Sequence, residues 1–389
     1  MSTTKSVAET ATPTAERPAS ADAAAGLGAE EFDAVGVDAV VERFRRPPDL
    51  DDELWRLLRQ IPPGRVTTYA ALAEALGDHR NAARWVGEAM LDHDHDAGCP
   101  CFRVVRSDGR LGHFIHCGGT ARETQAELLR RDGIVTATTQ RHRGNESADR
   151  VELGRYGCEP VPGSRPLAHL RALQESLRGH VRLDGVGELP HCVAGVDVSY
   201  ANPREGVVAY TLFDREGREP VWATTLRRPV RFPYISTYLA YRELPLLLAV
   251  LDAARRAGRL APVVLVDGSG ILHPSGMGVA TTLGVVTGVP TVGVAKKLLC
   301  GSVDKETSVP PDGAAAAPGG IISRAVRQDG TVTATALWTS PRSGRPVYVS
   351  PGSGVSVRGA AEIVCHWGRG RRLPEPLWWA DRLSRQAAR

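Results

Sequence analysis

Hydrophobic positions recur with a helical period in the first half of the chain. The stretch DDELWRLLRQIPPGRVTTYAALAEALG, which begins at Asp51, predicts a helix, a Pro/Gly break and a second helix with one apolar face. A third short helix is predicted over NAARWVGEAM, with Asn81 as its N-cap. The segment TARETQAELLRRDG predicts a closing helix that ends at Gly133. Short helices joined by a tight turn indicate a helix-turn-helix unit.

In the second half, continuous apolar runs alternate with helical segments. HCVAGVDVSY and GVVAYTLFD predict strands, and YLAYRELPLLLAVLDAARRAG predicts a long helix. APVVLVDGSG predicts a buried strand, and TVGVAKKLL predicts a strand that runs into a helix. This alternation predicts an α/β domain with a partly parallel sheet and helices packed on it.

Two segments lack any such period. Residues 1–48 are rich in Ala, Thr, Glu and Asp, which predicts a disordered tail because they bury too little apolar surface to offset their ordering entropy. Residues 136–165 have several turn residues and no periodicity, so they predict a linker. We therefore expect a multidomain chain, with a helical domain over 49–135 and an α/β domain over 166–389.

Composition and charge indicate the class of partner and the cellular compartment. Residues 1–50 carry five basic and nine acidic side chains, which leaves 43 basic against 35 acidic for the rest, and such an excess favours a polyanion as partner without identifying which one. No apolar run reaches the roughly 18 residues that span a bilayer, and the amino terminus lacks the apolar stretch of a signal peptide. We expect no membrane partner and a cytoplasmic location. The odd number of cysteines, seven, fits free thiols in a reducing compartment.

Three acids of the second half stand in apolar surroundings. Asp197 lies inside an apolar strand, Asp267 ends the run VVLV, and Glu243 lies in an apolar helix. A buried carboxylate needs a cation or a shifted pKa, and hard divalent ions such as Mg²⁺ bind to small sets of carboxylates. The three acids therefore either hold metal for attack on a phosphodiester, or they cap turns, with Glu243 paired to Arg242.

Six motifs of the second half together resemble endonuclease V, a repair nuclease that acts near deaminated purines. They are VAGVDVSY, FPYISTYLAYRELP, VLVDGSGILHP, GVATTLGVVTGVPTVGVAKKLLCG, PVYVSPG and LPEPLWWADR, in the order and spacing of that family. The resemblance implies a ribonuclease H-like fold from about residue 166 onward. It implies that Asp197, Glu243 and Asp267 are catalytic acids that bind Mg²⁺, for which Mn²⁺ can substitute. It also implies that Asp381 is a fourth metal ligand and that Lys296 is a catalytic residue near the scissile phosphate.

The same resemblance implies how a lesion is recognised. The segment PYIS, residues 233–236, corresponds to the wedge that enters the duplex, with Tyr234 stacking in place of displaced base contacts. His273 is expected beside the metal. Ser236 stands where many bacterial members have proline and resembles animal members that favour inosine in RNA. RNA therefore stays open as an alternative substrate, while the first half of the chain favours damaged DNA.

The first half resembles the DNA-binding domain of O6-alkylguanine-DNA alkyltransferase over about residues 51–135. The motifs that carry the resemblance are IPPGRVTTYAALAEALG, NAARWVGEAM, PCFRVVRSDGRLG and AELLRRDG. It implies a winged-helix-like helix-turn-helix that binds O6-alkylguanine in duplex DNA. Tyr69 would push on the target phosphate, Arg84 would fill the space left by the flipped base, and Cys101 aligns with the alkyl acceptor.

The residues that activate the acceptor do not align. Phe102 replaces the histidine after the acceptor, Asp132 replaces the glutamate before the closing glycine, and His93 replaces an upstream asparagine. A thiol with a pKa of about 8.5 is only a few per cent thiolate at neutral pH. We therefore expect Cys101 to give weak or no methyl transfer, as in the alkyltransferase-like proteins, which only bind and flip alkylated bases.

Other interpretations of these residues remain open. Cys101 is alternatively a small core residue or one ligand of a zinc site. The chain as a whole is alternatively an active bifunctional methyltransferase and endonuclease V, a non-catalytic lesion sensor, or an inosine-RNA endonuclease. The sequence leaves its oligomeric state open. The zinc candidates are His93, His95, Cys99, Cys101, His113, His116 and Cys117.

Overall fold

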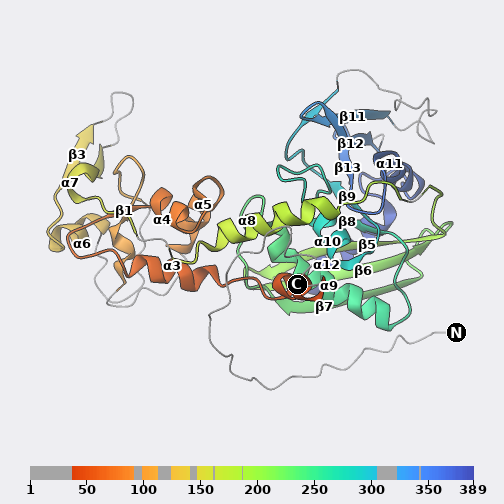
Figure 1. Cartoon of the computed structure of the whole chain (residues 1–389), viewed down its shortest axis with the longest axis horizontal. Coiled ribbons are helices and arrows are strands. Elements are labelled where there is room, and N and C mark those ends of the chain that lie inside the picture. Colours follow the sequence, from red (N-terminus) through yellow and green to blue (C-terminus); the bar gives the residue numbers. More distant parts are fainter. Residues whose placement is uncertain are drawn as a thin grey trace.

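The computed structural model places two lobes side by side, joined by helix α8 (Pro166–Leu177) (Figure 1). No helix of the described part is long and apolar enough to cross a membrane. The structure describes residues 37–91, 99–112, 124–140, 147–160, 163–185, 187–304, 322–340 and 343–389.

The amino-terminal lobe contains the predicted helix-turn-helix. Asp78 is the N-cap of α5, since its side chain accepts hydrogen bonds from the backbone N–H groups of Arg80 and Asn81. The prediction of Asn81 as the N-cap is therefore wrong by three residues. Gly133, in the left-handed region at φ 80°, follows helix α6 as expected. The elements are α3 (Leu50–Leu58), β1 (Thr67–Thr68), α4 (Tyr69–Ala75), α5 (His79–Ala89), η1 (Pro100–Arg103), β2 (Val104–Val105) and α6 (Gln125–Arg131).

The predicted linker is ordered over much of its length. β3 (Thr136–Gln140) and β4 (Ser147–Val151) pair as an antiparallel hairpin, and α7 (Leu153–Tyr156) follows. Val151 and Tyr156 pack with Val66, Leu129 and Ile134 in a small core of the lobe. The linker prediction is therefore wrong for residues 136–140 and 147–156, because they form paired strands and a short helix, and Val151 and Tyr156 are buried in this core.

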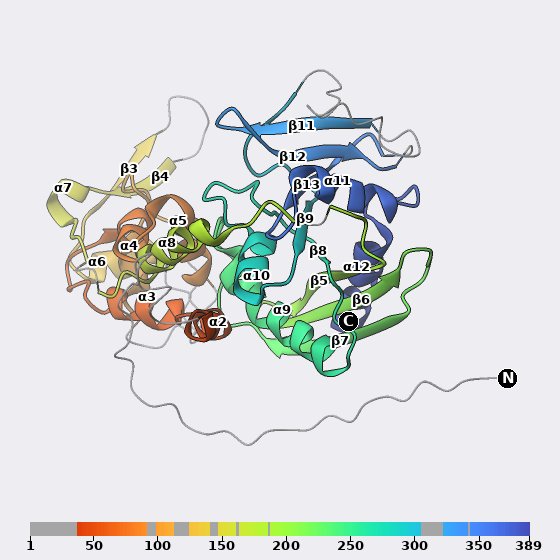
Figure 2. The ribbon, with the colours of Figure 1, turned by 45° about the vertical axis from the view of Figure 1, so that its right-hand side comes forward.

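The predicted tail also contains structure near its end. Helix α2 (Val37–Arg45) lies between the lobes and packs on α9 (Leu239–Arg256) (Figure 2). Phe44 is buried and stacks on Tyr241, with ring centroids 4.9 Å apart, and Arg45 pairs with Asp252 at 2.5 Å. The expectation of disorder is therefore wrong for α2, while residues 1–36 lie outside the described part of the chain.

The larger lobe is built on a mixed sheet of nine described strands. Their order is β10-β11-β12-β13-β9-β8-β5-β6-β7, and β5, β8 and β9 are parallel to one another. The partly parallel sheet is thus confirmed. The strands are β5 (Cys192–Asn202), β6 (Glu205–Asp214), β7 (Trp222–Pro229), β8 (Val264–Val266), β9 (Thr291–Ala295), β10 (Ser302–Val303), β11 (Ile322–Gln328), β12 (Thr331–Trp338) and β13 (Val347–Pro351).

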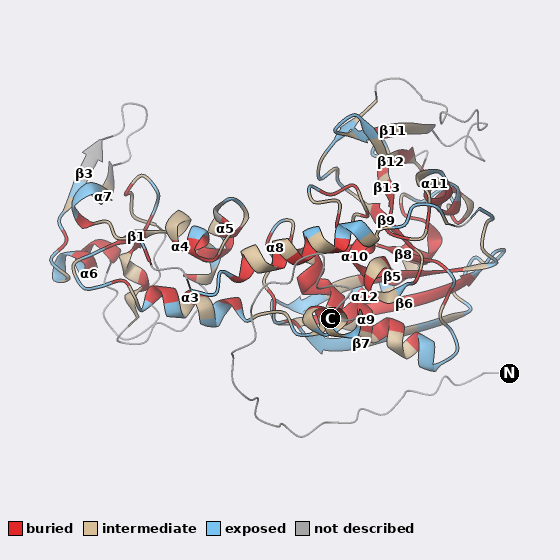
Figure 3. Ribbon diagram, in the orientation of Figure 1, coloured by how far each residue is buried: buried red, intermediate tan, exposed pale blue. Residues whose placement is uncertain are grey.

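Helices cover both faces of this sheet, as burial along its central strands shows (Figure 3). Val264 and Val266 pack on the side of α9 and α10 (Val279–Thr287), whereas Leu265 faces α11 (Val357–His366) and α12 (Glu375–Ala388). A Cβ at Gly195 would meet the Pro376 carbonyl carbon at 2.4 Å, so α12 lies directly on β5. The helix predicted after β9 is wrong, because the chain bends there and continues into β10.

Candidate active site

Three of the predicted acids meet at the sheet. Asp197 lies on β5 and Asp267 directly follows β8, and these strands are parallel neighbours. Asp381 comes from α12, which packs across β5. One carboxylate oxygen from each of the three lies within 4.8 Å of the others. Residues far apart in sequence therefore form one acidic cluster.

Lys296, just beyond β9, supplies the positive charge of this cluster. Its Nζ donates to Asp267 Oδ2 at 2.5 Å and to Asp381 Oδ1 at 3.1 Å. Arg385 also donates to Asp381 Oδ1, at 2.9 Å. Although burial opposes the charged form, the two carboxylates raise the pKa of Lys296 above its ordinary value. The ammonium therefore stays protonated at neutral pH.

Asp197 is held by a residue that the sequence analysis did not identify. Ser384 Oγ, on α12, donates to Asp197 Oδ2 at 2.6 Å, and its other hydroxyl neighbour is Ser199 at 2.8 Å. Burial and the charge of Asp267 raise the pKa of Asp197 to about 7. Ser384 stands on the same face of α12 as Asp381, three residues later, and this spacing is the only sequence signal that marks it.

Glu243 completes the acidic group from the other face of the sheet. Burial, followed by the charges of Asp197 and Asp267, raises the pKa of Glu243 to about 8. Its carboxylate accepts a hydrogen bond from the Tyr200 hydroxyl at 3.2 Å. Arg242 instead donates to the backbone carbonyls of residues 203 and 232 and stacks on the Tyr200 ring, so the expected alternative of a Glu243–Arg242 pair is wrong.

The donor set fits a hard divalent cation. Three converging carboxylates with a fourth nearby offer the oxygen ligands that Mg²⁺ and similar ions prefer. Burial is the main cause of the raised pKa values of Asp197 and Glu243, and the charges of neighbouring carboxylates raise them further, which a bound cation would offset. Charge and ligand type therefore both favour a metal at Asp197, Asp267 and Asp381, with Glu243 adjacent.

The cysteine of the amino-terminal lobe has different surroundings. Cys101 lies in η1 with 4% of its surface exposed. A hydrogen bond with the Cys99 side chain, followed by burial, raises the pKa of Cys101 far above its ordinary range. Asp132 is occupied by Arg103, which donates to both carboxylate oxygens at 2.7 and 2.8 Å. Phe102 packs against the small core of the lobe, so the residue directly after Cys101 supplies no base.

Comparison with known proteins identifies the larger lobe. A family model described as Endonuclease V matches residues 175–382, which is more than half of the chain. The chain belongs to the endonuclease V family. A Xanthomonas campestris endonuclease V is 37% identical over 220 residues, covering 56% of this chain and 87% of the relative. The structure of the catalytic domain of human endonuclease V is similar, with a TM-score of 0.50, 32% identity and coverage of 58% of this chain and 97% of that one.

The amino-terminal lobe matches a second family. The model described as 6-O-methylguanine DNA methyltransferase, DNA binding domain, matches residues 49–134. A Picrophilus torridus protein described as a bifunctional methyltransferase/endonuclease is 35% identical over 257 residues, covering 66% of this chain and 77% of the relative. The predicted fusion is therefore confirmed: an alkyltransferase-like DNA-binding domain precedes an endonuclease V domain, which makes the chain a nuclease of a metal-dependent family. The winged-helix detail stays a prediction.

The loop 233–236, predicted to be a wedge, is exposed at its tip. Tyr234 has 64% of its surface exposed, and Ser236 is exposed beside it. Ile235, between them, is buried and anchors the loop. Thr237 follows with φ 71°, in the left-handed region. An exposed aromatic side chain on an anchored loop has the placement that base stacking requires.

His273 is engaged within its own loop rather than among the acids. Burial lowers the pKa of His273 to about 4, and its Nδ1 is 2.8 Å from the Ser275 hydroxyl. Its backbone carbonyl accepts a hydrogen bond from Gln328. Within the described ranges, the cluster able to hold a metal consists of the three aspartates and does not include His273.

Tyr69 and Arg84 lie on the two helices of the helix-turn-helix. Tyr69 opens α4, and its hydroxyl lies so close to Gly112 that a Cβ there would be 2.3 Å away. Arg84 is exposed on α5 and pairs with Glu88 at 2.9 Å. Their predicted DNA contacts remain predictions. Of the proposed zinc ligands, His93, His95, His113, His116 and Cys117 lie outside the described residues.

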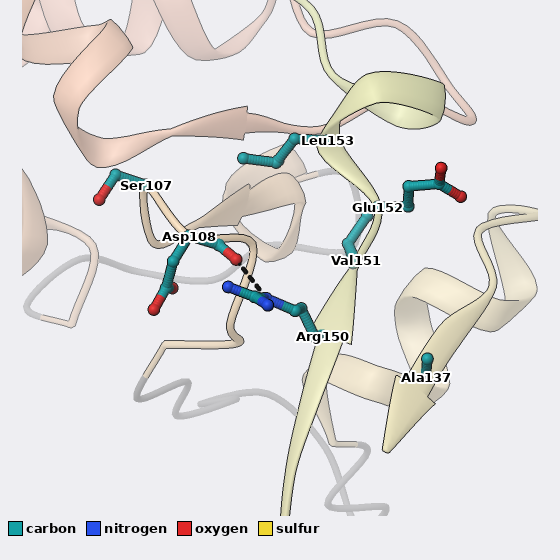
Figure 4. Close-up of a pocket in the computed structure, with 7 residues that line it drawn as sticks. All are labelled: Ser107, Asp108, Ala137, Arg150, Val151, Glu152 and Leu153. Carbon is teal, nitrogen blue, oxygen red and sulfur yellow. Dashed lines mark hydrogen bonds between the residues drawn. The ribbon is translucent and has the colours of Figure 1, made fainter. Parts of the chain in front are cut away.

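The pocket drawn in Figure 4 belongs to the alkyltransferase-like domain and not to the acidic cluster. It has a volume of about 360 Å³ and lies between the turn that follows β2 and strand β4. Arg150 crosses it and donates through Nε to the backbone carbonyl of Asp108. The pocket lining is mostly apolar and holds no cluster of catalytic groups. It is lined by Ser107, Asp108, Ala137, Arg150, Val151, Glu152 and Leu153.

Proposed function

We propose that this protein is a DNA-repair endonuclease that nicks a strand on the 3′ side of a deaminated purine, with Mg²⁺ as its cofactor. Its amino-terminal domain binds duplex DNA that contains O6-alkylguanine, without efficient methyl transfer. The observation that carries the proposal is the cluster of Asp197, Asp267 and Asp381 around the Lys296 ammonium. Membership in the endonuclease V family supports the same chemistry.

Each member of the cluster has a role that follows from its contacts. Asp197, Asp267 and Asp381 hold the cation, and Glu243 contributes from the facing helix. A bound divalent cation neutralises the charge that develops on the phosphodiester during hydrolysis. Lys296 keeps its proton because two carboxylates flank it, so it presents a fixed positive charge to the phosphate.

Lesion recognition is assigned to the exposed loop 233–236. Tyr234 is free to stack on bases, and displacing a mispaired deaminated base costs little. DNA is the favoured substrate because the other domain matches a DNA-binding family. Inosine in RNA is the second substrate to test, because Ser236, which is exposed on the loop, resembles the residue of animal family members that favour RNA.

A nicking assay tests the proposal. The full chain is incubated with a duplex that holds one deoxyinosine, with Mg²⁺, with Mn²⁺ or with EDTA, and the product ends are mapped. We expect a single nick 3′ to the inosine with either metal, and none in EDTA or on the matched guanine duplex. Lesion binding without nicking in any metal would favour a non-catalytic sensor. Faster cleavage of a matched inosine RNA would overturn the DNA preference.

An active methyltransferase is the second candidate, favoured by the name of the Picrophilus torridus relative. The surroundings of Cys101 oppose it, because the thiol is buried and hydrogen-bonded to Cys99, and the residue directly after it is Phe102 rather than a base. Methylation of Cys101 on incubation with an O6-methylguanine duplex would favour this second candidate.

A further inference from the structure

A buried polar network joins the two domains directly beneath the 233–236 loop. Asp78 Oδ2 accepts a hydrogen bond from the Tyr238 hydroxyl at 2.9 Å and pairs with the Arg171 guanidinium. Arg171 Nη2 also donates to the Tyr238 hydroxyl at 3.1 Å. Asp78 and Tyr238 are 5% and 1% exposed. An acid of the alkyltransferase-like domain is therefore bonded to the residue that opens α9 of the endonuclease domain.

The same carboxylate caps α5, the second helix of the helix-turn-helix in its own domain. Asp78 Oδ1 caps α5 through the backbone N–H groups of Arg80 and Asn81. Hydrogen bonds from Asn81 and Tyr238 and the charge of Arg171 outweigh burial and lower the pKa of Asp78. The acid is thus ionised at neutral pH, and bonds to an ionised group are stronger than neutral ones.

Backbone contacts make this junction rigid. The N–H of Leu167, on α8, donates to the carbonyl of Leu76 at 3.0 Å. A Cβ at Gly77 would meet the backbone nitrogen of Ala168 at 2.6 Å, so the helix-turn-helix lies directly on α8. Two turns further along α8, Gln174 Nε2 donates to the carbonyl of Thr237, the residue that follows the wedge, at 3.2 Å.

Strain in the backbone shows why the wedge needs such support. Thr237 has φ 71°, which is costly for a β-branched residue. Strained residues of this kind persist where surrounding structure holds them, and they gather at functional sites. Thr237 lies between the exposed loop and Tyr238: its carbonyl accepts a hydrogen bond from Gln174 of α8, and the residue after it, Tyr238, donates to Asp78.

We propose that Asp78 is a positioning residue for the endonuclease: it holds Tyr238 and thereby fixes the strained base of the lesion-inserting loop. The inference rests on the proposed function, since it assigns a support to the loop that reads the lesion. It follows that the amino-terminal domain contributes to nicking without contacting the reacting phosphate.

The experiment compares two substitutions that each remove one buried hydroxyl. Tyr238→Phe loses the hydroxyl contacts to Asp78, Arg171 and the Leu167 carbonyl, whereas the control Tyr241→Phe loses a bond to the Leu170 carbonyl on the same helix α8. We expect Tyr238→Phe to raise KM for the inosine duplex roughly tenfold with kcat unchanged, as loss of a bond to a charged group would do. Tyr241→Phe should leave both constants as they were.

A third substitution separates positioning from simple destabilisation. Thr237→Gly allows φ 71° without strain, so the loop no longer depends on its anchor. In that background the effect of Tyr238→Phe on KM should shrink to less than about threefold. The backbone at position 237 is then unstrained, so the loop depends less on the hydrogen bond between Tyr238 and Asp78. Asp78→Asn, which keeps the shape of the side chain, should raise KM in the same way as Tyr238→Phe.

Several outcomes overturn the inference. Equal KM values for Tyr238→Phe and Tyr241→Phe, or an undiminished effect in the Thr237→Gly background, exclude a positioning role. A fall in kcat that follows the loss of thermal stability in both variants indicates a structural role alone. If the unsubstituted protein neither binds nor nicks the inosine duplex, the proposed function fails and the inference fails with it. If it does both and the variants match, only the inference fails.

Discussion

Cys101 should resist methylation when the protein is incubated with a duplex that contains O6-methylguanine. The reason lies in the described surroundings of the thiol. The thiol is buried and hydrogen-bonded to Cys99, and Phe102 occupies the position where the relay would need a base. Asp132 is held by Arg103 through two hydrogen bonds and cannot serve as the acid of a relay.

The size of the effect follows from the fraction of thiolate. A thiol with the ordinary pKa of about 8.5 is about 3% thiolate at pH 7, and a thiol with a pKa of 7 is half ionised. Because the pKa of Cys101 is raised, its thiolate fraction lies below the first figure. Transfer should therefore be at least roughly tenfold slower than for a thiol activated to a pKa of 7.

Mass spectrometry of the Cys101 peptide provides the assay. The unsubstituted protein is compared with Phe102→His, which introduces a base, and with Cys99→Ala, which removes the bond that raises the pKa of the acceptor. Methylation that appears only in Phe102→His would identify the missing base as the cause, and methylation only in Cys99→Ala would identify the thiol pair. Rapid stoichiometric methylation of the unsubstituted protein would refute the reasoning.

Three further predictions concern the endonuclease domain. Tyr234→Ala should weaken binding to an inosine duplex by about 1 to 3 kcal/mol, the value of a lost base stack, without changing thermal stability; unchanged affinity in a titration at fixed salt would make Tyr234 only structural. Ser384→Ala should lower kcat roughly tenfold through loss of its bond to Asp197, while Ser199→Ala should not; equal kcat values in the two variants would exclude this role. In EDTA the unfolding temperature should fall as pH rises from about 5 to 8. The folded protein raises the pKa of Asp197 to about 7 and the pKa of Glu243 to about 8, so the stability that protonation provides at low pH is lost as both groups ionise. Added Mg²⁺ should reverse most of this fall. A melting temperature in EDTA that rises over this pH range in the unsubstituted protein, but not in Asp197→Asn, would contradict the raised pKa of the buried acids.

The sequence predicted those parts of the fold whose pattern is local. The strands around Asp197 and the long helix that carries Glu243 follow from apolar runs and helical periodicity, and the structure confirms both elements. Helix α2 and the hairpin of β3 and β4 were missed. In α2, Val37, Val40, Val41 and Phe44 do recur at helical spacing, a signal that the composition of the first 48 residues obscures. The strands β3 and β4 have few apolar side chains, and Val151 becomes buried only against partners that are distant in sequence.

The site was predicted to a similar extent. The converging aspartates were identified from their motifs, since each motif is contiguous. Ser384 and Asp78 were not, because a serine on a helix and an acid before a helix are common, and only the fold brings them to Asp197 and Tyr238. His273 was expected beside the metal, but the structure places it in contact with Ser275 of its own loop rather than among the acids.

The most direct test of the metal-dependent nuclease is the nicking of a deoxyinosine duplex by the unsubstituted protein and by Asp197→Asn, with lesion affinity measured in parallel. Asp197 is buried within the acidic cluster, whereas Tyr234 of the predicted wedge is exposed and does not belong to that cluster. We expect Mg²⁺-dependent nicking that is abolished in Asp197→Asn while the Kd for the inosine duplex is largely retained. Nicking that persists in Asp197→Asn, or nicking by the unsubstituted protein in EDTA, would contradict the account.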